Sequence, residues 1–245
     1  MHAVIGGSGL SRLAGLDVLE RKVARTPFGA PSGPLTIGTL QGQALVFLAR
    51  HGDGHGIAPH QVNYRANLWA LKDMGVDRVA SIVSVGGIRA DLVPGVLLVP
   101  DQILDYTWGR AVTFFEGSEA RVTHIDFTEP YTASERQRIL AAAAACGEEI
   151  VDGGVYAATQ GPRLETAAEI RRLEGDGADI VGMTGMPEAA LARELELAYA
   201  AIAVVANTAA GRGASARAIP LEHVGAVLDQ AMGRVRRIIE RWVLA

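Results

Sequence analysis

Short runs of aliphatic and β-branched residues recur along the whole chain. They occupy residues 4–5, 45–48, 79–85, 96–99, 155–158, 180–181 and 200–205. An apolar run that lacks polar alternation is typical of a strand buried on both faces of a sheet. The pattern therefore predicts a largely buried central sheet.

Segments with helical periodicity lie between several of these runs. Residues 66–74 have a helical pattern that ends at Gly75, a common stop signal. A second segment, residues 187–195, has the acidic Glu188 in its first turn, where a carboxylate favours the positive end of the helix dipole. Residues 221–243 place apolar and charged side chains at helical spacing, and they predict a long amphipathic helix that closes the fold.

The order of these elements predicts a single α/β domain over residues 1–245, with a central mixed β-sheet flanked by helices. No internal repeat, low-complexity tract or Pro/Ser-rich linker divides the chain. Open α/β sheets bind ligands beyond the ends of their strands. The residues that directly follow each apolar run are therefore the candidates for a functional site.

Composition and charge exclude several classes of partner. The formal net charge of −4 gives no bulk positive field that would attract nucleic acid or an anionic membrane. The single cysteine, Cys146, excludes an internal disulfide and a thiol-based zinc cluster, and it favours a reducing compartment. We expect neither a signal peptide nor a membrane span, because no basic leader and no sufficiently long apolar segment is present. The sequence therefore predicts a cytoplasmic protein.

A glycine-rich turn, Gly-Gly-Ser-Gly at residues 6–9, directly follows the first apolar run. Glycines let backbone N–H groups converge on an anion, and the hydroxyl of Ser8 adds another donor. The dinucleotide fingerprint fails because Arg12 occupies its third glycine position, and no Gly-Lys-Ser/Thr follows for an ATP-type loop. The turn suits a small free anion, although a plain tight turn has the same composition.

Further anion-binding side chains follow other apolar runs. Arg50 and His51 come directly after residues 45–48. An arginine at this point can hold phosphate oxygens bidentately and the histidine can donate another hydrogen bond, while the alternative is an ion pair at a strand end. Thr184 follows the run at residues 180–181, and Ser84 precedes two glycines. Several such groups at strand ends favour an oxyanion pocket.

Five motifs occur in a fixed order along the chain. They are Gly-Gly-Ser-Gly at 6–9, Arg-His-Gly at 50–52, Val-Asn-Tyr-Arg-Ala-Asn at 62–67, Gly-Pro-Arg-Leu-Glu-Thr at 161–166 and Gly-Met-Thr at 182–184. In this order they resemble the trimeric purine nucleoside and methylthioadenosine phosphorylases, and the resemblance covers nearly the whole chain. Residues 63–72 and 182–194 are most similar to the bacterial subgroup of that family that acts on methylthioinosine.

The resemblance implies a pentosyltransferase that uses inorganic phosphate as a co-substrate to cleave the glycosidic bond of a purine nucleoside. It implies a homotrimer with an active site at each subunit boundary, and no organic cofactor, nucleic-acid partner or membrane partner. We also predict no metal site, because His51, His55 and His60 lie in a glycine-rich loop without a carboxylate scaffold.

The same resemblance assigns roles to individual residues. Those implied in phosphate binding are Ser8, Arg50, His51, Thr184 and Ser84, the last through its backbone. Relatives often have alanine where this chain has Ser84 and a small polar residue at Val83, which leaves the side-chain role of Ser84 open. Met183 is implied to pack against the ribose and Leu164 to contact the substrate. His124 is implied to reach the neighbouring subunit's site near the 5' group.

The resemblance also places Glu165 and Asn207 in the base pocket. A 6-oxopurine has a donor at N1 and acceptors at O6 and N7, so a carboxylate and an amide match it, whereas adenine inverts this pattern. Adenine-selective relatives have aspartate in place of Asn207 and a second acid where this chain has Ala209. We therefore predict hypoxanthine over adenine. Taken alone, Glu165 has an alternative as a helix cap, and Asn207 has one as a turn residue.

The start of the last predicted helix determines the expected 5' substituent. Relatives that accept ordinary nucleosides have a histidine near the 5'-hydroxyl, and methylthio-specific relatives have an aliphatic residue. The resemblance puts Leu221 at the position near the 5' group, with Val224 one turn later. An apolar wall of this kind suits a methylthio group. A slip of two residues would bring His223 to this point and favour inosine.

These expectations combine into one reaction: phosphorolysis of methylthioinosine to hypoxanthine and 5-methylthioribose 1-phosphate. Phosphate would stabilise a cation-like sugar, Asn207 would stabilise the departing base at N7, and Glu165 would orient it. The alternatives are a phosphorylase for inosine and guanosine, a methylthioadenosine phosphorylase, and a hydrolase. A non-catalytic nucleotide-binding module is the alternative outside the enzymes.

Overall fold

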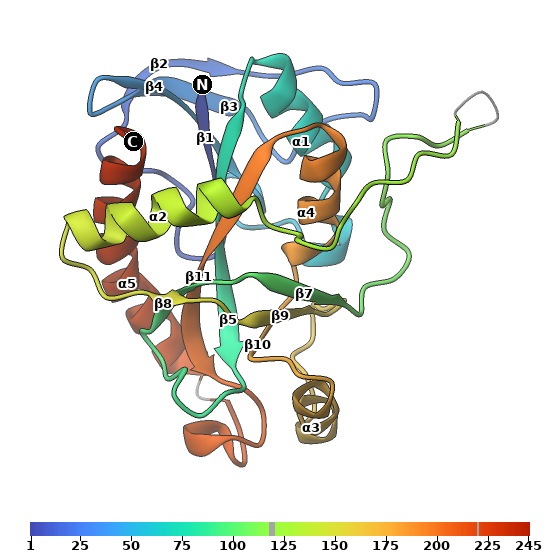
Figure 1. Ribbon diagram of the computed structural model, residues 1–245, viewed down its shortest axis with the longest axis vertical. Helices are drawn as coiled ribbons and strands as arrows, with labels where there is room; N and C mark the ends of the chain where they lie inside the picture. Colours follow the sequence, from blue (N-terminus) through green and yellow to red (C-terminus); the bar gives the residue numbers. More distant parts are fainter. Residues whose placement is uncertain (118–120, 220) are drawn as a thin grey trace.

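The computed structural model of the protein describes residues 1–117, 121–219 and 221–245 (Figure 1). In these residues the strands are β1 (His2–Gly6), β2 (Asp17–Lys22), β3 (Leu35–Leu40), β4 (Gln43–Ala49), β5 (Arg78–Gly87), β6 (Leu97–Val99), β7 (Gln102–Asp105), β8 (Val151–Asp152), β9 (Val155–Ala158), β10 (Ile180–Gly182) and β11 (Ala198–Thr208). The helices are α1 (Tyr64–Asp73), α2 (Ala133–Ala145), α3 (Ala167–Gly175), α4 (Gly185–Glu194) and α5 (Leu221–Trp242), with short 3-10 turns η1 (Pro59–Gln61) and η2 (Gly213–Ser215).

All of these strands belong to one mixed sheet. Its main path runs β2-β3-β4-β1-β5-β10-β9-β7, and β11, β6 and β8 extend it from the other side of β5. Strands β4, β1, β5 and β11 are mutually parallel, whereas β10 is antiparallel to β5. The predicted α/β fold with a central mixed sheet is confirmed, and each predicted apolar run coincides with a strand, with β6 beginning one residue later than its run.

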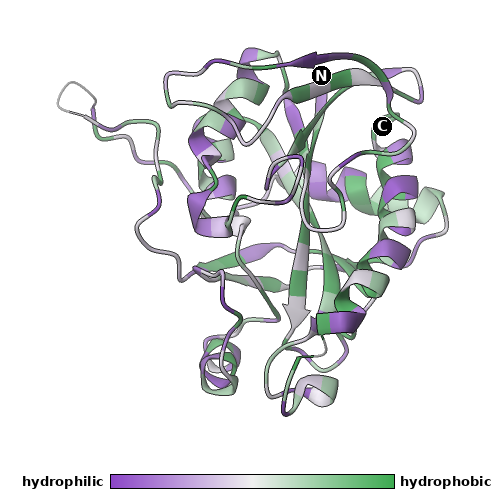
Figure 2. Cartoon of the chain, turned by 180° about the vertical axis from the view of Figure 1, so that it is seen from behind, coloured by the Kyte–Doolittle hydropathy of each residue, from purple (hydrophilic) through white to green (hydrophobic). Residues whose placement is uncertain are grey.

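Helices cover both faces of the sheet because neighbouring residues of its strands point to opposite sides. In β5, Val79 and Val83 join the core that contains α1 and α4, whereas Ala80 and Ile82 join the core that contains α2 and α5. All four side chains are buried. Figure 2 shows the hydrophobic strands at the centre and polar residues on the outer faces of the helices. This burial on both faces explains why the strands read as continuous apolar runs.

Local sequence signals determine where two of the helices begin. The side chain of Asn63 caps α1 by accepting a hydrogen bond from the backbone N–H of Ala66. Helix α3 begins with a reciprocal capping box between Thr166 and Glu169. The alternative interpretation of Glu165 as the helix cap is therefore wrong, because Thr166 takes that position.

The apolar pattern did not indicate strands β2, β3, β7 and β8. Every residue of β2 is exposed, so it has no buried run. Strand β7 has exposed residues at both ends, and β8 has only two residues. These strands pair at the margins of the sheet, where one-sided or missing burial removes the sequence signal.

One irregularity of the sheet opens a space beside β5. Strand β11 pairs with β5 along the whole length of β5. On the other side, β1 pairs with β5 only up to Ser81, and β10 pairs only with Gly86 and Gly87. In the described residues, the stretch from Ile82 to Val85 therefore has no strand neighbour on that side, and its backbone polar groups face a gap.

Among the helices of the described ranges, none combines the length and the apolar character that a bilayer-spanning segment needs.

Candidate active site

A cavity of about 470 Å³ lies over the gap beside β5. It is within the size range of small-molecule sites. The predicted site residues that line it are Ser8, Arg50, His51, Ser84, Leu164, Glu165, Met183, Thr184, Asn207, Leu221 and Val224. The elements that supply them are far apart in sequence, and the folding of the sheet brings their ends together. In particular, Arg50 and Thr184, which come from different strands, lie on the same cavity.

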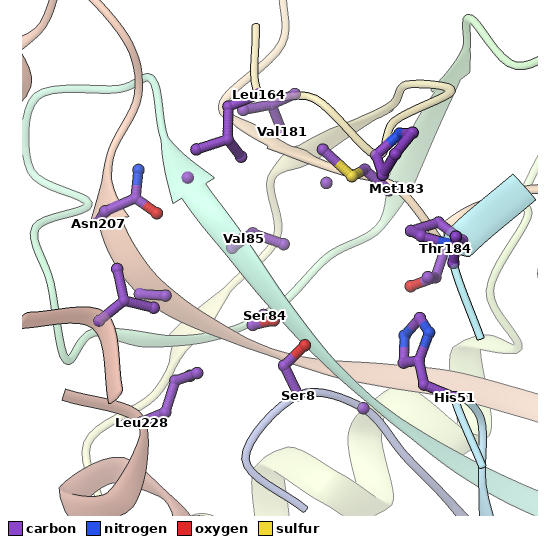
Figure 3. Close-up of a pocket in the computed structure, with 18 of the residues that line it drawn as sticks. Ser8, His51, Ser84, Val85, Leu164, Val181, Met183, Thr184, Asn207 and Leu228 are labelled. Carbon is purple, nitrogen blue, oxygen red and sulfur yellow. The ribbon is translucent and has the colours of Figure 1, made fainter. Parts of the chain in front are cut away.

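Polar side chains lie on two sides of the cavity and along one of its edges (Figure 3). His51 and Thr184 lie on one side, Asn207 lies on the other, and the hydroxyls of Ser8 and Ser84 lie between them along one edge. Thr184 is buried, and its backbone N–H donates to the hydroxyl of Tyr156 at 3.3 Å. We call Ser8, His51, Ser84 and Thr184 the hydroxyl end of the cavity.

The glycine-rich turn after β1 is shaped by close backbone packing. A Cβ atom on Gly6 would lie 2.1 Å from the carbonyl oxygen of Leu10. On Gly7 it would lie 2.5 Å from the carbonyl oxygen of Ile82 and 2.9 Å from Nη1 of Arg50. The two glycines therefore let the turn approach β5 and Arg50 closely, and they present Ser8 to the cavity.

Arg50 is fully buried, and its geometry differs from the expected one. Its Nε and Nη2 donate to the carboxylate of Glu188 at 2.6 and 2.9 Å. Nη2 also donates to Ser81 Oγ at 2.6 Å, and Nη1 donates to the carbonyl oxygen of Ile82 at 3.0 Å. The edge of the guanidinium that could hold phosphate bidentately is therefore occupied by Glu188, and the bidentate mode predicted from the sequence is not available in this arrangement.

Glu188 is a functional candidate that the sequence analysis missed. Its side chain is fully buried, and its Oε1 also accepts from Ser81 Oγ at 2.6 Å and from the hydroxyl of Tyr199 at 2.8 Å. Burial alone would raise the pKa of Glu188, but the charge and hydrogen bonds of Arg50 lower it below its ordinary value. Glu188 is thus ionised. The signal in the sequence was a lone acid in an otherwise apolar stretch, which we assigned only to a helix first turn.

The two histidines near Arg50 are uncharged at neutral pH. Burial and then the positive charge of Arg50 lower the pKa of His51 to about 4, and the same two causes lower the pKa of His55. Nδ1 of His51 lies 2.8 Å from the carbonyl oxygen of Ile57, which can only accept, so Nδ1 carries the proton. The free Nε2 of neutral His51 is consequently an acceptor, where the sequence analysis expected a donor.

The predicted base residues also lie on the cavity, with their side chains held by neighbours. Thr159 Oγ1 donates to Oε1 of Glu165 at 2.6 Å, which leaves Oε2 of that carboxylate for another donor. Nδ2 of Asn207 donates one hydrogen to the carbonyl oxygen of Thr208 at 2.7 Å, and its second hydrogen is left for another acceptor. Ala209 lines the same part of the cavity.

The start of α5 contributes an apolar wall. Leu221, Val224 and Leu228 line the cavity, each about one helical turn after the last. His223 is exposed, and it is absent from the cavity lining in the described part of the chain. The structure therefore brings the aliphatic residues of this helix to the cavity and leaves the histidine outside it.

His124 is the one predicted site residue that does not line the cavity of its own chain. It is exposed and lies on the arm, residues 107–117 and 121–130, which extends outward in Figure 1. This position neither tests nor contradicts the predicted contact with a neighbouring subunit.

Arg110, at the base of the arm, is a second residue that the sequence analysis missed. Its guanidinium donates to the carbonyl oxygens of Met183 and Met186 at 2.8 and 2.6 Å. It also donates to those of Thr159 and Gln160 at 3.2 and 2.9 Å. Arg110 therefore joins the loop that precedes Glu165 to the loop that carries Thr184. An arginine in an irregular segment gives no sequence signal for this role.

Within residues 1–117, 121–219 and 221–245, no group of three His, Cys, Asp or Glu side chains is arranged to hold a metal ion.

Comparison with known proteins identifies the family. The family model described as the phosphorylase superfamily matches residues 2–243. The chain belongs to the phosphorylase superfamily. This membership confirms the family that the five sequence motifs indicated.

Members of this superfamily with high similarity to the chain carry related names. A protein of Pseudomonas syringae pv. tomato, described as a probable S-methyl-5'-thioinosine phosphorylase, is 52% identical over 98% of this chain and 97% of its own length. The 6-oxopurine nucleoside phosphorylase of Pyrococcus furiosus is 45% identical over 85% of this chain and 80% of its own length.

A solved structure of the family has the same fold. Methylthioadenosine phosphorylase from Schistosoma mansoni, in complex with adenine, matches with a TM-score of 0.95 and 34% identity. The match covers 99% of this chain and 90% of the other.

Proposed function

We propose that the protein uses inorganic phosphate to cleave S-methyl-5'-thioinosine into hypoxanthine and 5-methylthioribose 1-phosphate. The observation that carries this proposal is a single cavity with a hydroxyl end, a carboxylate and amide pair, and an apolar wall. Relatives that are 52% identical to this chain are described as probable S-methyl-5'-thioinosine phosphorylases, which supports this choice of substrate.

Inorganic phosphate occupies the hydroxyl end in this proposal. Ser8 and Thr184 donate hydrogen bonds to its oxygens, as do the backbone N–H groups near Ser84 that face the gap beside β5. The remaining N–H of Arg50 Nη1 adds one charge-assisted donor. Because Nε2 of neutral His51 is an acceptor, it matches the hydrogen of a monohydrogen phosphate ion.

The purine occupies the part of the cavity between Glu165 and Asn207. The free Oε2 of Glu165 accepts from N1–H of a 6-oxopurine, and the free amide hydrogen of Asn207 donates to N7 or O6. Adenine has a lone pair at N1, which would face the carboxylate. Ala209 supplies no second acid that could accept from a 6-amino group. These contacts support hypoxanthine as the base.

The 5' substituent lies against the apolar wall of α5. Leu221, Val224 and Leu228 offer no hydrogen-bond partner to a 5'-hydroxyl. A methylthio group can contact them without the loss of a hydrogen bond to water. Met183, which lines the cavity beside Thr184 (Figure 3), packs against the sugar. Leu164, on the opposite rim, covers the base.

The reaction follows from the charges that develop as the glycosidic bond breaks. The sugar becomes cation-like at C1' while the base gains electron density. A phosphate oxygen bonds to C1' as the bond to the base nitrogen breaks, and the bonding electrons leave with the purine. Asn207 stabilises the purine at N7, and Glu165 holds its orientation. The chain needs no side-chain nucleophile, metal or organic cofactor in this mechanism.

We further propose that the protein acts as a cytoplasmic homotrimer. His124 on the arm then completes the site of a neighbouring subunit near the 5' group. His124 is exposed and lies outside the cavity of its own chain, which is compatible with this contact. Neither nucleic acid nor a membrane is a partner.

A comparison of three nucleosides tests the proposed function. Methylthioinosine, inosine and methylthioadenosine are each assayed for release of the free base, with and without phosphate. We expect methylthioinosine to give the highest kcat/KM and release to require phosphate. Dominant cleavage of methylthioadenosine would contradict the assignment of the base pocket. Cleavage that persists without phosphate would indicate a hydrolase, and binding of hypoxanthine without any cleavage would indicate a binding module.

Inosine and guanosine form the second candidate class of substrate. The 45% identity to the 6-oxopurine nucleoside phosphorylase of Pyrococcus furiosus favours it. The base contacts are the same for both classes, so the 5' group decides between them. A higher kcat/KM for inosine than for methylthioinosine would select this second class.

A further inference from the structure

The buried pair of Arg50 and Glu188 has a feature that phosphate binding alone does not explain. Both side chains have no exposed surface, and they are joined by two hydrogen bonds, Nε to Oε2 at 2.6 Å and Nη2 to Oε1 at 2.9 Å. A buried ion pair loses hydration that a hydrophobic pair of similar size would not lose. Stability therefore gives no sufficient reason for the pair as a whole, although Glu188 is the partner that a buried Arg50 requires.

The hydrogen bonds that Arg50 makes within the protein leave it few free N–H donors for a ligand. A guanidinium has five N–H donors. Nε donates to Glu188, Nη2 donates to Glu188 and Ser81, and Nη1 donates to the carbonyl oxygen of Ile82. The hydrogen that remains is on Nη1, and Arg50 is among the residues that line the cavity.

The charges around the hydroxyl end cancel. The positive charge of Arg50 is matched by ionised Glu188, which Ser81 and Tyr199 hold in place through hydrogen bonds of 2.6 and 2.8 Å. His51 and His55 carry no charge at neutral pH. An anion that enters this site meets neutral donors, one arginine N–H and an ion pair without net charge, so Arg50 and Glu188 together do not neutralise it.

We propose that Glu188 is a positioning residue that withholds the charge and the bidentate edge of Arg50 from bound phosphate. This inference rests on the proposed phosphorolysis. The sugar becomes cation-like next to the phosphate, and an anion that keeps its charge stabilises that cation more strongly. An arginine free to neutralise the phosphate would bind the ground state more tightly and help the transition state less. Glu188 thus favours turnover at the expense of phosphate affinity.

The substitution Glu188→Gln tests this role because it removes the negative charge and keeps the shape. At saturating methylthioinosine, we expect the phosphate KM to fall about fivefold and kcat to fall about tenfold. A substitution that merely damaged the site would raise the phosphate KM. Glu135→Gln is the matched control, because Glu135 is also buried and ionisable but is bonded to Trp242, between α2 and α5. Both constants of this control should stay within about twofold.

Two further measurements keep the test decisive. If Glu188→Gln does not fold, Glu188→Asp takes its place. The shorter side chain keeps the charge but holds it further from Arg50, so the phosphate KM and kcat should each fall by about twofold to threefold. Calorimetric titration with inorganic phosphate alone should show tighter binding to the variant that folds than to the unsubstituted protein. This titration needs no turnover, so it tests Glu188 even if the unsubstituted protein cleaves no nucleoside and the proposed function fails. A phosphate KM or Kd that rises or is unchanged overturns the role of Glu188, as does an unchanged kcat.

Discussion

In the proposed function, recognition of the base depends on two side chains whose free hydrogen-bonding groups are opposite in kind. Glu165 has a spare acceptor, because Thr159 occupies only one of its oxygens. Asn207 has a spare donor, because Thr208 takes only one of its amide hydrogens. A buried polar group that meets the wrong partner costs about 1–3 kcal/mol. In the proposed function, the identity of these two residues therefore sets the preference for a 6-oxopurine.

The substitution Asn207→Asp should weaken this preference. It replaces a donor with an acceptor at N7 and O6, so kcat/KM for methylthioinosine should fall about tenfold to a hundredfold. The same carboxylate can accept from a 6-amino group, so the ratio of methylthioadenosine to methylthioinosine cleavage should rise. The ratio of the two kcat/KM values measures the effect within one protein preparation. An unchanged ratio would remove Asn207 from base recognition.

His51 makes the stability of the folded protein depend on pH. Burial and the nearby charge of Arg50 lower its pKa from 6.5 to about 4. Between these two values the unfolded chain binds a proton that the folded chain does not. The free energy of unfolding should therefore fall as the pH falls through this window, by up to about 3 kcal/mol.

The variant His51→Asn retains a donor for the carbonyl oxygen of Ile57 and removes the titrating ring. Urea unfolding is measured from about pH 7 down to about pH 4. Over this range the free energy of unfolding should fall less steeply with falling pH for this variant than for the unsubstituted protein. His60→Gln, at an exposed histidine of η1, is the control and should keep the slope of the unsubstituted protein. Equal slopes for His51→Asn and the unsubstituted protein would contradict the neutral state of His51.

At the residue scale, polar groups at strand ends were predictable and their partners were not. Ser8, Arg50 and Thr184 follow apolar runs, and the rule that ligands bind beyond strand ends was enough to select them. The partner of Arg50 is Glu188, which is 138 residues away in the sequence. No local pattern gives such a pairing, so the sequence analysis expected the guanidinium to be free for phosphate.

At the scale of elements, the glycine-rich turn at residues 6–9, which follows β1, packs closely against β5. The Cβ of an alanine at Gly7 would lie 2.5 Å from the carbonyl oxygen of Ile82, a backbone atom that cannot turn away. It would also lie 2.9 Å from Nη1 of Arg50. The turn, the open stretch of β5 and Arg50 therefore form one packed unit.

The substitution Gly7→Ala should disturb all three parts of this unit. We expect the free energy of unfolding to fall by about 1–3 kcal/mol, because a well-packed site has no room for another methyl group. The phosphate KM should rise as Nη1 of Arg50 is displaced. Gly33→Ala is the control, since a Cβ there has no neighbour within 4 Å. If the two variants were equally stable and had the same phosphate KM, the packed unit would be refuted.

Elements buried on both faces were predictable, and marginal elements were not. Strand β5 has a mainly apolar sequence because α1 and α4 cover one face and α2 and α5 the other. Strand β2, which pairs with β3, is exposed throughout, so its sequence has no hydrophobic pattern from which a strand could be predicted. The beginning of α3 had a readable signal, the spacing of Thr166 and Glu169, which the sequence analysis did not use.

At the scale of the whole molecule, the proposed homotrimer gives His124 on the arm a place in the site of a neighbouring subunit. The cavity of one chain contains Asn207 but not His124. In the proposed homotrimer, each site combines Asn207 of one subunit with His124 of its neighbour. Closed rotational symmetry repeats this combination at every boundary.

Mixed trimers test this arrangement. We expect His124→Ala and Asn207→Ala each to lower the turnover of methylthioinosine when purified alone. Mixed trimers are isolated after co-expression with a different affinity tag on each variant, and they should have about a third of the unsubstituted activity, because one boundary in each receives both intact residues. A mixture no more active than the separate variants would show that His124 does not act across a boundary.

The overall fold could be predicted, but the assembled cavity could be predicted only in part. The order of apolar runs and helical segments was sufficient for an α/β fold. The gap beside β5 arises because β1 and β10 pair with different ends of the same strand. Such non-local pairing is not encoded in any single segment. The resemblance to a family supplied the site residues that local patterns could not connect.

The most direct test of phosphate-dependent cleavage follows the fate of phosphate itself. Methylthioinosine and inorganic phosphate are incubated with the protein, and the products are followed by phosphorus NMR and by chromatography of the base. The account predicts that each hypoxanthine released is matched by one sugar 1-phosphate. Hypoxanthine that appears with free methylthioribose, while the phosphate signal stays constant, would contradict it.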